Sequence, residues 1–124
     1  MVKMSAQDKN LGVVAVCDLW SKRREGTAER IKEMFGTVVK QFKYSEQLLE
    51  MPGLDAVMVA TGDFQHAKIL AEVVKAGKDC YCEKPMADSV DDAKLARKAV
   101  LDSKQVVQMG SQWVSEPGSE KCVI

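Results

Sequence analysis

The sequence lacks the features that mark several large classes of protein. Its 124 residues carry no excess of positive charge, because eighteen Lys and Arg balance eighteen Asp and Glu. This balance argues against a chain that coats nucleic acid or an anionic membrane surface. No apolar run approaches the roughly 18 residues of a membrane-spanning helix, and residues 1–10 are too polar for a secretory signal. We therefore expect a cytoplasmic protein without nucleic-acid or membrane partners.

Metal-binding patterns are also missing. None of the four cysteines forms a Cys-x-x-Cys pair, and the single histidine, His66, has no cysteine nearby, so we expect no metal site. Cys80 and Cys82 lie two residues apart and would share one face of a strand. They are either a redox-sensing pair or two small buried residues of a sheet, and cytoplasmic thiols favour the second interpretation.

Glycine-rich phosphate loops are absent as well. The eight glycines include no Gly-x-Gly-x-x-Gly pattern and no loop of the Walker type. A phosphate group needs several backbone N–H groups converging at the start of a helix. The sequence offers no strong site of this kind.

Short apolar runs alternate with amphipathic stretches along the chain. The apolar runs predict strands at 11–17, 38–42, 56–60, 79–82 and 106–109, and the stretches between them predict helices at 21–35, 45–51, 63–76 and 89–103. We expect Ser21, Ser45, Asp63 and Ser89 to cap these helices, and Gly36 and Gly77 to end the first and third. The continuous run at 11–17 is typical of a strand buried on both faces. The alternation predicts an α/β fold, a three-layer, doubly wound parallel sheet of about five strands.

Three groups of polar residues follow predicted strands, where ligands bind in open parallel sheets. Asp18 closes the first strand, and a carboxylate there either accepts the hydroxyls of an adenosine ribose or simply opens the next helix. The basic residues at 22–24 either hold a ribose 2′-phosphate or form a solvated helical turn. The other two groups are the turn at 61–63 and the segment Glu83-Lys84-Pro85.

Lys84 and His66 are the candidates for chemistry. A lysine at the carboxyl end of a strand can polarise a hydroxyl or carbonyl oxygen and help a proton leave; the alternative is a surface pair with Glu83. His66 falls in the first turn of a predicted helix, where the helix dipole favours the neutral ring. Taken alone, it is more typical of a packing or capping residue than of a catalyst.

Several segments together resemble a known family. They read VVAVCD at 13–18, LDAVMVATGDFQH at 54–66, AGKDCYCEKPMADS at 76–89 and VVQMGSQ at 106–112. They are similar to the N-terminal domain of the glucose–fructose oxidoreductase, inositol dehydrogenase and MocA (Gfo/Idh/MocA) family. The resemblance covers the chain from about residue 11 to Gln112.

The resemblance implies a function for each candidate residue. Asp18 matches the acidic residue that holds the adenosine ribose, while Ala60 and Thr61 match the turn that lines the cofactor. His66 matches the family histidine after that turn. The segment 83–85 matches the family motif, in which the lysine approaches nicotinamide and substrate, so the implied catalytic residue is Lys84 and Glu83 and Pro85 flank the cofactor. The implied cofactor is NAD or NADP, and the implied substrate is a sugar or cyclitol hydroxyl.

Two departures from the family pattern, one at each end of the chain, set further expectations. Family members begin with a strand and a glycine-rich loop, whereas this chain starts inside the helix that follows them. We therefore expect residues 1–112 to form a partial, Rossmann-like dinucleotide-binding domain lacking its first strand, and 113–124 to begin a missing substrate domain. If the sheet closes over the gap, its order becomes the flavodoxin-like 2-1-3-4-5, with residues 13–17 paired directly to 56–60.

Three functions follow from these observations. The first is the truncated NAD(P)-binding domain of an oxidoreductase, inactive alone, whose small-molecule substrate binds only the full-length protein. The second is a stand-alone, non-catalytic binding or structural module. It would either bind a small anion or nucleotide beside Asp18, Thr61 and Lys84, or associate as a homodimer through apolar surface around 106–113. The third is a flavin protein, which the acidic Asp18 disfavours because it would repel a terminal phosphate.

Overall fold

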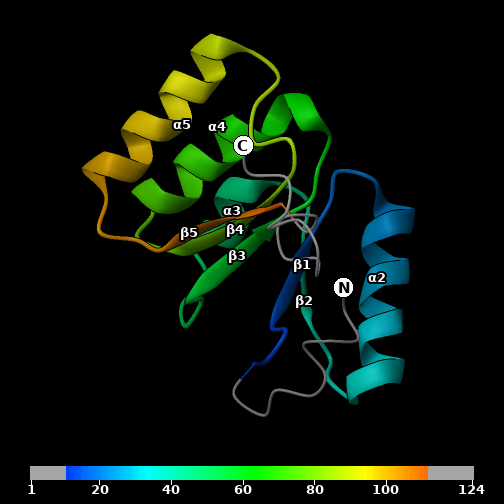
Figure 1. The fold of residues 1–124 in the computed structure, drawn as a ribbon. Helices are drawn as coiled ribbons and strands as arrows, with labels where there is room; N and C mark the ends of the chain where they lie inside the picture. The colour runs from blue at the N-terminus through cyan, green and yellow to red at the C-terminus, as the bar shows by residue number, and fades with distance from the viewer. Residues whose placement is uncertain (1–10, 112–124) are drawn as a thin grey trace, which may run out of the picture. The chain divides into compact units, whose positions relative to one another are not determined.

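The computed structural model describes residues 11–111, which form strands alternating with helices. Along the chain the elements are β1 (Ala15–Cys17), α2 (Ser21–Phe35), β2 (Lys40–Phe42), α3 (Ser45–Leu49), β3 (Ala56–Val59), α4 (Asp63–Lys75), β4 (Asp79–Glu83), α5 (Val90–Asp102) and β5 (Val107–Gly110) (Figure 1). Every strand pair is parallel. The expected α/β class and the expected order of elements are confirmed.

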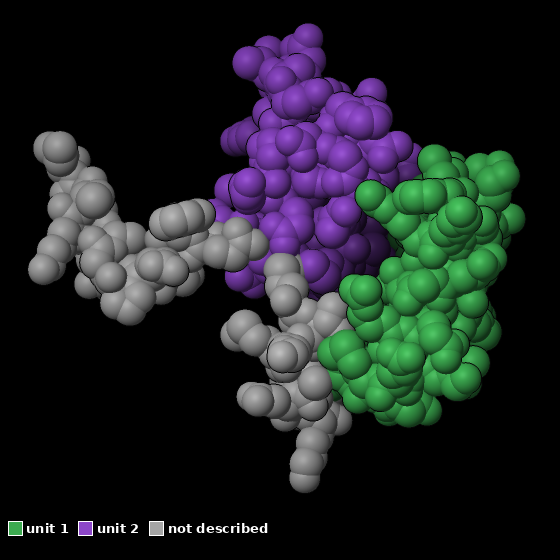
Figure 2. All heavy atoms as spheres, turned by 90° about the vertical axis from the view of Figure 1, so that its right-hand side faces the viewer, with its two compact units in different colours: residues 1–54 green, residues 55–124 purple. Residues whose placement is uncertain are grey.

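The chain divides into two compact units, residues 1–54 and 55–124, coloured separately in Figure 2. In the first unit, β1 pairs with β2 in a register that sets Val16 opposite Gln41. Helices α2 and α3 pack on these two strands. All three residues of β1 are only half-buried, so the expectation of a strand buried on both faces is wrong here.

The second unit contains a three-stranded sheet of order β3-β4-β5. Helix α4 packs on β3 and β4, and α5 packs against α4 (Figure 1). Its largest fully buried side chains are Leu70, Val73, His66 and Cys82. Cys80 and Cys82 are both buried, as expected for residues that share the covered face of β4.

Three of the predicted helix signals act as expected. Gly36 ends α2 in the left-handed conformation with φ 68°, which glycine adopts without steric cost. Gly77 follows the end of α4 with φ 74°, and its N–H donates to the carbonyl oxygen of Val74 at 3.1 Å. Ser89 caps α5, since its hydroxyl oxygen accepts the backbone N–H of Asp92 at 3.1 Å.

The other three predicted caps fall one residue too late. Ser21, Ser45 and Asp63 are the first helical residues, and the cap positions belong to Trp20, Tyr44 and Gly62, which make no side-chain cap hydrogen bond. The physical reason is backbone geometry, because each of these cap residues has the extended ψ that an N-cap requires.

The strand pairs within residues 11–111 are β1 with β2 in the first unit, and β3 with β4 and β4 with β5 in the second. Helices α2 and α3 pack on β1, and α4 packs on β3. The direct pairing expected between residues 13–17 and 56–60 would join the two units, and it stays a prediction.

The boundary expected after Gln112 lies outside the described residues, as does Trp113. No helix in the described part of the chain is both long enough and apolar enough to cross a membrane.

Candidate functional site

The second unit gathers most of the predicted site residues at one edge of its sheet. Because β3 and β4 are parallel neighbours, the segments that follow them leave the sheet at the same edge. Ala60 and Thr61 follow β3, and Lys84 and Pro85 follow β4. His66 lies in the first turn of α4. The structure thus brings together five of the seven residues singled out by the sequence, and Glu83, the last residue of β4, is the sixth.

His66 is the buried polar group of this edge. Its side chain is 1% exposed, and its two ring nitrogens face backbone carbonyl oxygens. Nδ1 lies 2.6 Å from the carbonyl oxygen of Pro85, and Nε2 lies 3.1 Å from that of Thr61. The ring therefore contacts the segments that follow both strands.

Lys84 is exposed next to this buried ring. Its peptide bond to Pro85 is cis. The salt bridges described within residues 11–111 lie on α2 and α5. Lys84 directly follows β4 and is exposed at the carboxyl end of this strand.

Phe64 is a site residue that the sequence reasoning missed. It lies in the first turn of α4 and is 63% exposed. A Cβ atom added to Gly62 would come within 2.8 Å of the Phe64 ring, so the aromatic ring lies directly against the turn after β3. Thr61 and Ala60 in the same turn are exposed. An aromatic residue in a polar turn, where burial does not require it, was the signal available in the sequence.

Asp18 belongs to the first unit, at the carboxyl end of β1. One carboxylate oxygen, Oδ1, accepts the backbone N–H of Trp20 at 2.8 Å. The backbone N–H of Asp18 donates to the carbonyl oxygen of Phe42 at 3.2 Å. The carboxylate of Asp18 is therefore held by the residue that directly precedes α2.

Two of the three basic residues after Asp18 have partners within the protein. Arg24 donates from Nη1 to the backbone carbonyl oxygen of Asp18 at 2.8 Å. The guanidinium of Arg23 lies 5.6 Å from the centre of the Trp20 ring, in the range of a cation–π contact. Lys22 is exposed at the start of α2.

The residues present fit a dinucleotide in part. An oriented carboxylate at the end of β1 suits the hydroxyls of a ribose, because carboxylate oxygens only accept hydrogen bonds. An exposed lysine at the end of β4 suits a reacting oxygen. The sequence contains no glycine-rich loop to hold a pyrophosphate.

The three cysteines within the described residues have raised pKa values. Burial, followed by the neighbouring Cys82, raises the pKa of Cys80 from 9.0 to about 12. Burial also raises the pKa values of Cys82 and Cys17. Because the thiolate is the reactive form, these shifts lower the reactivity of the three thiols. Within residues 11–111, no three His, Cys, Asp or Glu side chains are placed to hold a metal ion.

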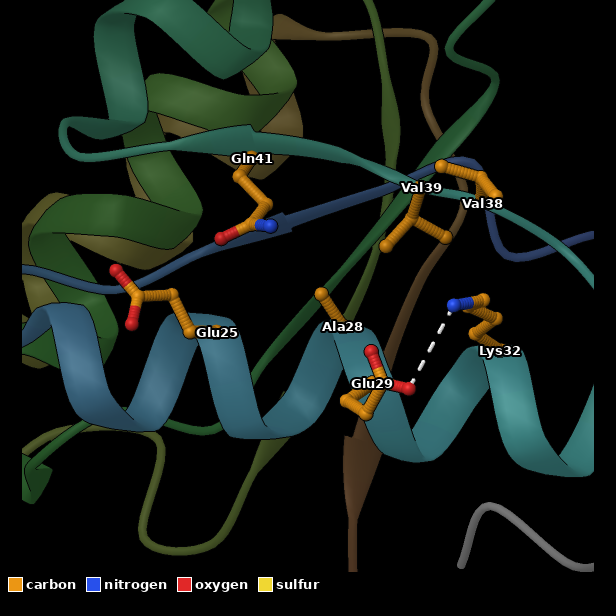
Figure 3. A pocket seen from close by; sticks show the side chains of 7 residues that line it. All are labelled: Glu25, Ala28, Glu29, Lys32, Val38, Val39 and Gln41. Atoms are coloured by element: carbon orange, nitrogen blue, oxygen red, sulfur yellow. Dashed lines mark ion pairs between the residues drawn. The ribbon is translucent and has the colours of Figure 1, made fainter.

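A cavity of about 360 Å³ lies elsewhere, between α2 and residues 38–41 of the first unit. Figure 3 shows Glu25 and Ala28 pointing into it from α2, and Val39 and Gln41 facing them. A salt bridge of 3.6 Å between Glu29 and Lys32 lies at its margin. None of the predicted site residues lines this cavity.

Comparison with known proteins gives the family. Residues 2–111 match the profile of the oxidoreductase family with an NAD-binding Rossmann fold, Gfo/Idh/MocA. The chain is 34% identical over 99 residues to an inositol 2-dehydrogenase of Rubrobacter xylanophilus, covering 79% of this chain and 27% of that protein. An inositol 2-dehydrogenase of Agrobacterium fabrum is 29% identical over 99 residues, covering 79% and 28%. The chain thus spans about a quarter of the length of these relatives.

Solved structures share the fold. A putative myo-inositol dehydrogenase from Sinorhizobium meliloti superposes with a TM-score of 0.76 at 24% identity, over 96% of this chain and 34% of the other. A 3-ketoreductase from Actinomadura kijaniata in complex with TDP-benzene and NADP gives 0.78 at 21% identity, over 98% and 36%. The profile match over residues 2–111 and the shared fold lead to one conclusion, that this chain belongs to the Gfo/Idh/MocA family of oxidoreductases and matches its NAD-binding Rossmann domain.

Proposed function

We propose that this chain is the dinucleotide-holding part of an oxidoreductase that acts on a hydroxyl group of a sugar or cyclitol. The observation that carries the proposal is the placement of Lys84, exposed at the carboxyl end of β4, in a chain of this family. Relatives named inositol 2-dehydrogenases support a cyclitol as the substrate class. The nicotinamide, when bound, accepts or donates the hydride.

The protein side chains would provide position and charge. Asp18 accepts a ribose hydroxyl, and its carboxylate is held in place by the N–H of Trp20 at 2.8 Å. The Lys84 ammonium stabilises negative charge on the substrate oxygen as the hydroxyl loses its proton. Thr61 and Phe64 line the neighbouring turn, where Phe64 offers an exposed apolar face.

The same residues favour NAD over NADP. A carboxylate at position 18 repels a ribose 2′-phosphate. Two of the three neighbouring cations are also engaged, since Arg24 is bonded to the Asp18 carbonyl oxygen and Arg23 lies over Trp20. Lys22 alone does not make the fork-shaped contact that guanidinium offers to a phosphate.

We further propose that residues 1–124 form part of a longer enzyme and do not turn over substrate alone. The chain spans 27% of the inositol 2-dehydrogenase from Rubrobacter xylanophilus and contains no glycine-rich loop. A lone lysine supplies charge without the positioning that accounts for much of an enzyme's rate. We place the protein in the cytoplasm, which fits the free thiols of Cys80 and Cys82.

Calorimetric titration of NADH and NADPH into the purified chain tests this proposal. We expect weak binding of NADH, weaker binding of NADPH, and a further loss of NADH affinity in Asp18→Asn. The control is Asp91→Asn, which removes the same charge from the exposed start of α5 in the other unit. Submicromolar binding of NADH would contradict the importance of a phosphate loop. Equal affinities of wild type and Asp18→Asn would contradict the assigned ribose contact.

A self-associating module is the second candidate function, and one observation favours it. Val106 is 70% exposed and Met109 is 42% exposed, and Met109 lies on β5, an edge strand of its sheet. Exposed apolar side chains at a sheet edge are suited to contact a second copy of the chain. Sedimentation analysis over a range of concentrations should then show a dimer that Val106→Lys weakens. A strictly monomeric wild type would eliminate this candidate.

A further inference from the structure

The His66 ring joins three separate segments of the second unit. The ring belongs to the first turn of α4, Thr61 follows β3, and Pro85 follows β4. Both contacts of the ring are with main-chain oxygens, at 2.6 Å from Nδ1 and 3.1 Å from Nε2. With the side chain 1% exposed, water has almost no access to either nitrogen.

The chemistry of the two contacts is asymmetric. Carbonyl oxygens only accept hydrogen bonds, so each contact is a hydrogen bond only where the ring nitrogen carries a proton. A neutral imidazole carries one such proton. The shorter distance, from Nδ1 to the Pro85 oxygen, identifies the segment after β4 as the one that the ring holds most firmly.

These contacts leave the ring little to offer a ligand. A cofactor contact needs an exposed donor or acceptor, and both nitrogens of His66 already face protein oxygens. A purely packing role does not explain the residue either, because burying a polar ring costs free energy that an apolar side chain would not. The arrangement is instead typical of a group that fixes its neighbours.

We propose that His66 is a positioning residue, which holds the main chain at Pro85 and so sets the location of Lys84. Lys84 directly precedes the bonded residue and carries a long, exposed side chain. Catalytic groups must be held to within a fraction of an ångström by such supporting contacts. The catalytic importance of the location of Lys84 rests on the function proposed above. The contacts by which His66 joins the segments after β3 and β4 do not rest on that function.

Three substitutions separate the two contacts. The amide nitrogen of Asn reaches about as far along the side chain as Nδ1, and that of Gln about as far as Nε2. His66→Asn therefore keeps a donor for Pro85, His66→Gln keeps a donor for Thr61, and His66→Leu keeps neither. Val73→Ala is the matched control, because Val73 is 1% exposed on the same helix and lies about 10 Å further along its axis.

Amide 1H–15N spectra of the full chain provide the measurement. We expect His66→Asn to shift the amide signals of residues 61–62 and to leave those of 84 and 86 in place. His66→Gln should do the opposite, and His66→Leu should shift both groups beyond the changes seen in Val73→Ala. If every variant moved both groups alike, or none did, the positioning role would be refuted.

The wild-type ring gives an independent answer, which does not depend on any variant folding. His66 is the single histidine of the chain, so a long-range 1H–15N spectrum of tag-free protein contains one ring. A proton on Nδ1, alone or together with one on Nε2, supports the proposal. A ring protonated on Nε2 alone would overturn it, because Pro85 would then have no donor.

Binding of NADH by the same variants separates this inference from the proposed function. If the spectra respond as expected while wild-type protein binds no NADH, the positioning contact stands and the proposed function fails. If NADH binds but the two groups of amides do not respond separately, the function stands and the role of His66 fails.

Discussion

Alkaline pH should destabilise the folded chain through Cys80. The thiol is 3% exposed on β4, and burial together with Cys82 raises its pKa from 9.0 to about 12. Above pH 9 the unfolded chain loses this proton while the folded chain keeps it, so unfolding releases a proton. Stability contributed by the protonated thiol is therefore fully present below pH 9 and is lost as the pH rises toward 12.

The size of the effect follows from the shift. One proton released on unfolding lowers the free energy of unfolding by about 1.4 kcal/mol for each pH unit. Across the whole window, the loss approaches about 4 kcal/mol, which is a large fraction of the roughly 5–15 kcal/mol that stabilises a typical domain. Alkali should therefore lower the stability of the second unit while Cys80 within it still carries its proton.

Urea unfolding followed by circular dichroism, between about pH 8 and about pH 11, measures this loss. Cys80→Ala is the comparison, because it removes the thiol and leaves all other alkaline groups in place. The variant should be less stable at neutral pH by about 1 kcal/mol, because a buried side chain is shortened. Its stability should fall less steeply with pH, so that the two curves converge. Curves that stay parallel through the window would refute the reasoning.

Two further predictions concern helix geometry. Gly26→Ala should stabilise the protein by up to about 1 kcal/mol, because Gly26 lies inside α2 with open space around its Cα. Gly36→Ala should instead destabilise the protein by about 1 kcal/mol, because φ is 68° at this residue. Thermal melting of both variants checks this pair, and equal shifts of the melting temperature would contradict it. Ser89→Ala should lower the free energy of unfolding by about 1 kcal/mol, because the N–H of Asp92 loses its acceptor at 3.1 Å. Ser89→Asp should recover most of that loss. A Ser89→Ala variant as stable as the wild type would show that the cap contributes nothing.

The order of strands and helices could be predicted because it depends on local patterns. Continuous apolar runs and amphipathic periods identified every element, and the Ser89–Asp92 spacing identified its cap to the residue. Strand pairing is different, because it depends on how helices pack on each sheet. The sequence therefore predicted β1 and β3 correctly as strands, but it could not predict the register that sets Val16 opposite Gln41.

The candidate site could likewise be predicted only in part. Its general location followed from the rule that parallel strands present their carboxyl ends at one edge, which brought Thr61, His66 and Lys84 together. The contacts of His66 could not be predicted, since its partners are backbone oxygens that carry no residue signature. Phe64 was missed because the sequence does not show that this residue, in the first turn of α4, is 63% exposed.

The bonding partners of the His66 ring have a consequence for how this region can evolve. Every amino acid supplies the same carbonyl oxygen, so substitutions at positions 61 and 85 do not remove an acceptor from the ring. Only a change at position 66 removes the ring that contacts both oxygens. The turns that would meet different substrates can therefore diversify in side chain, while a single buried imidazole keeps their backbones in register.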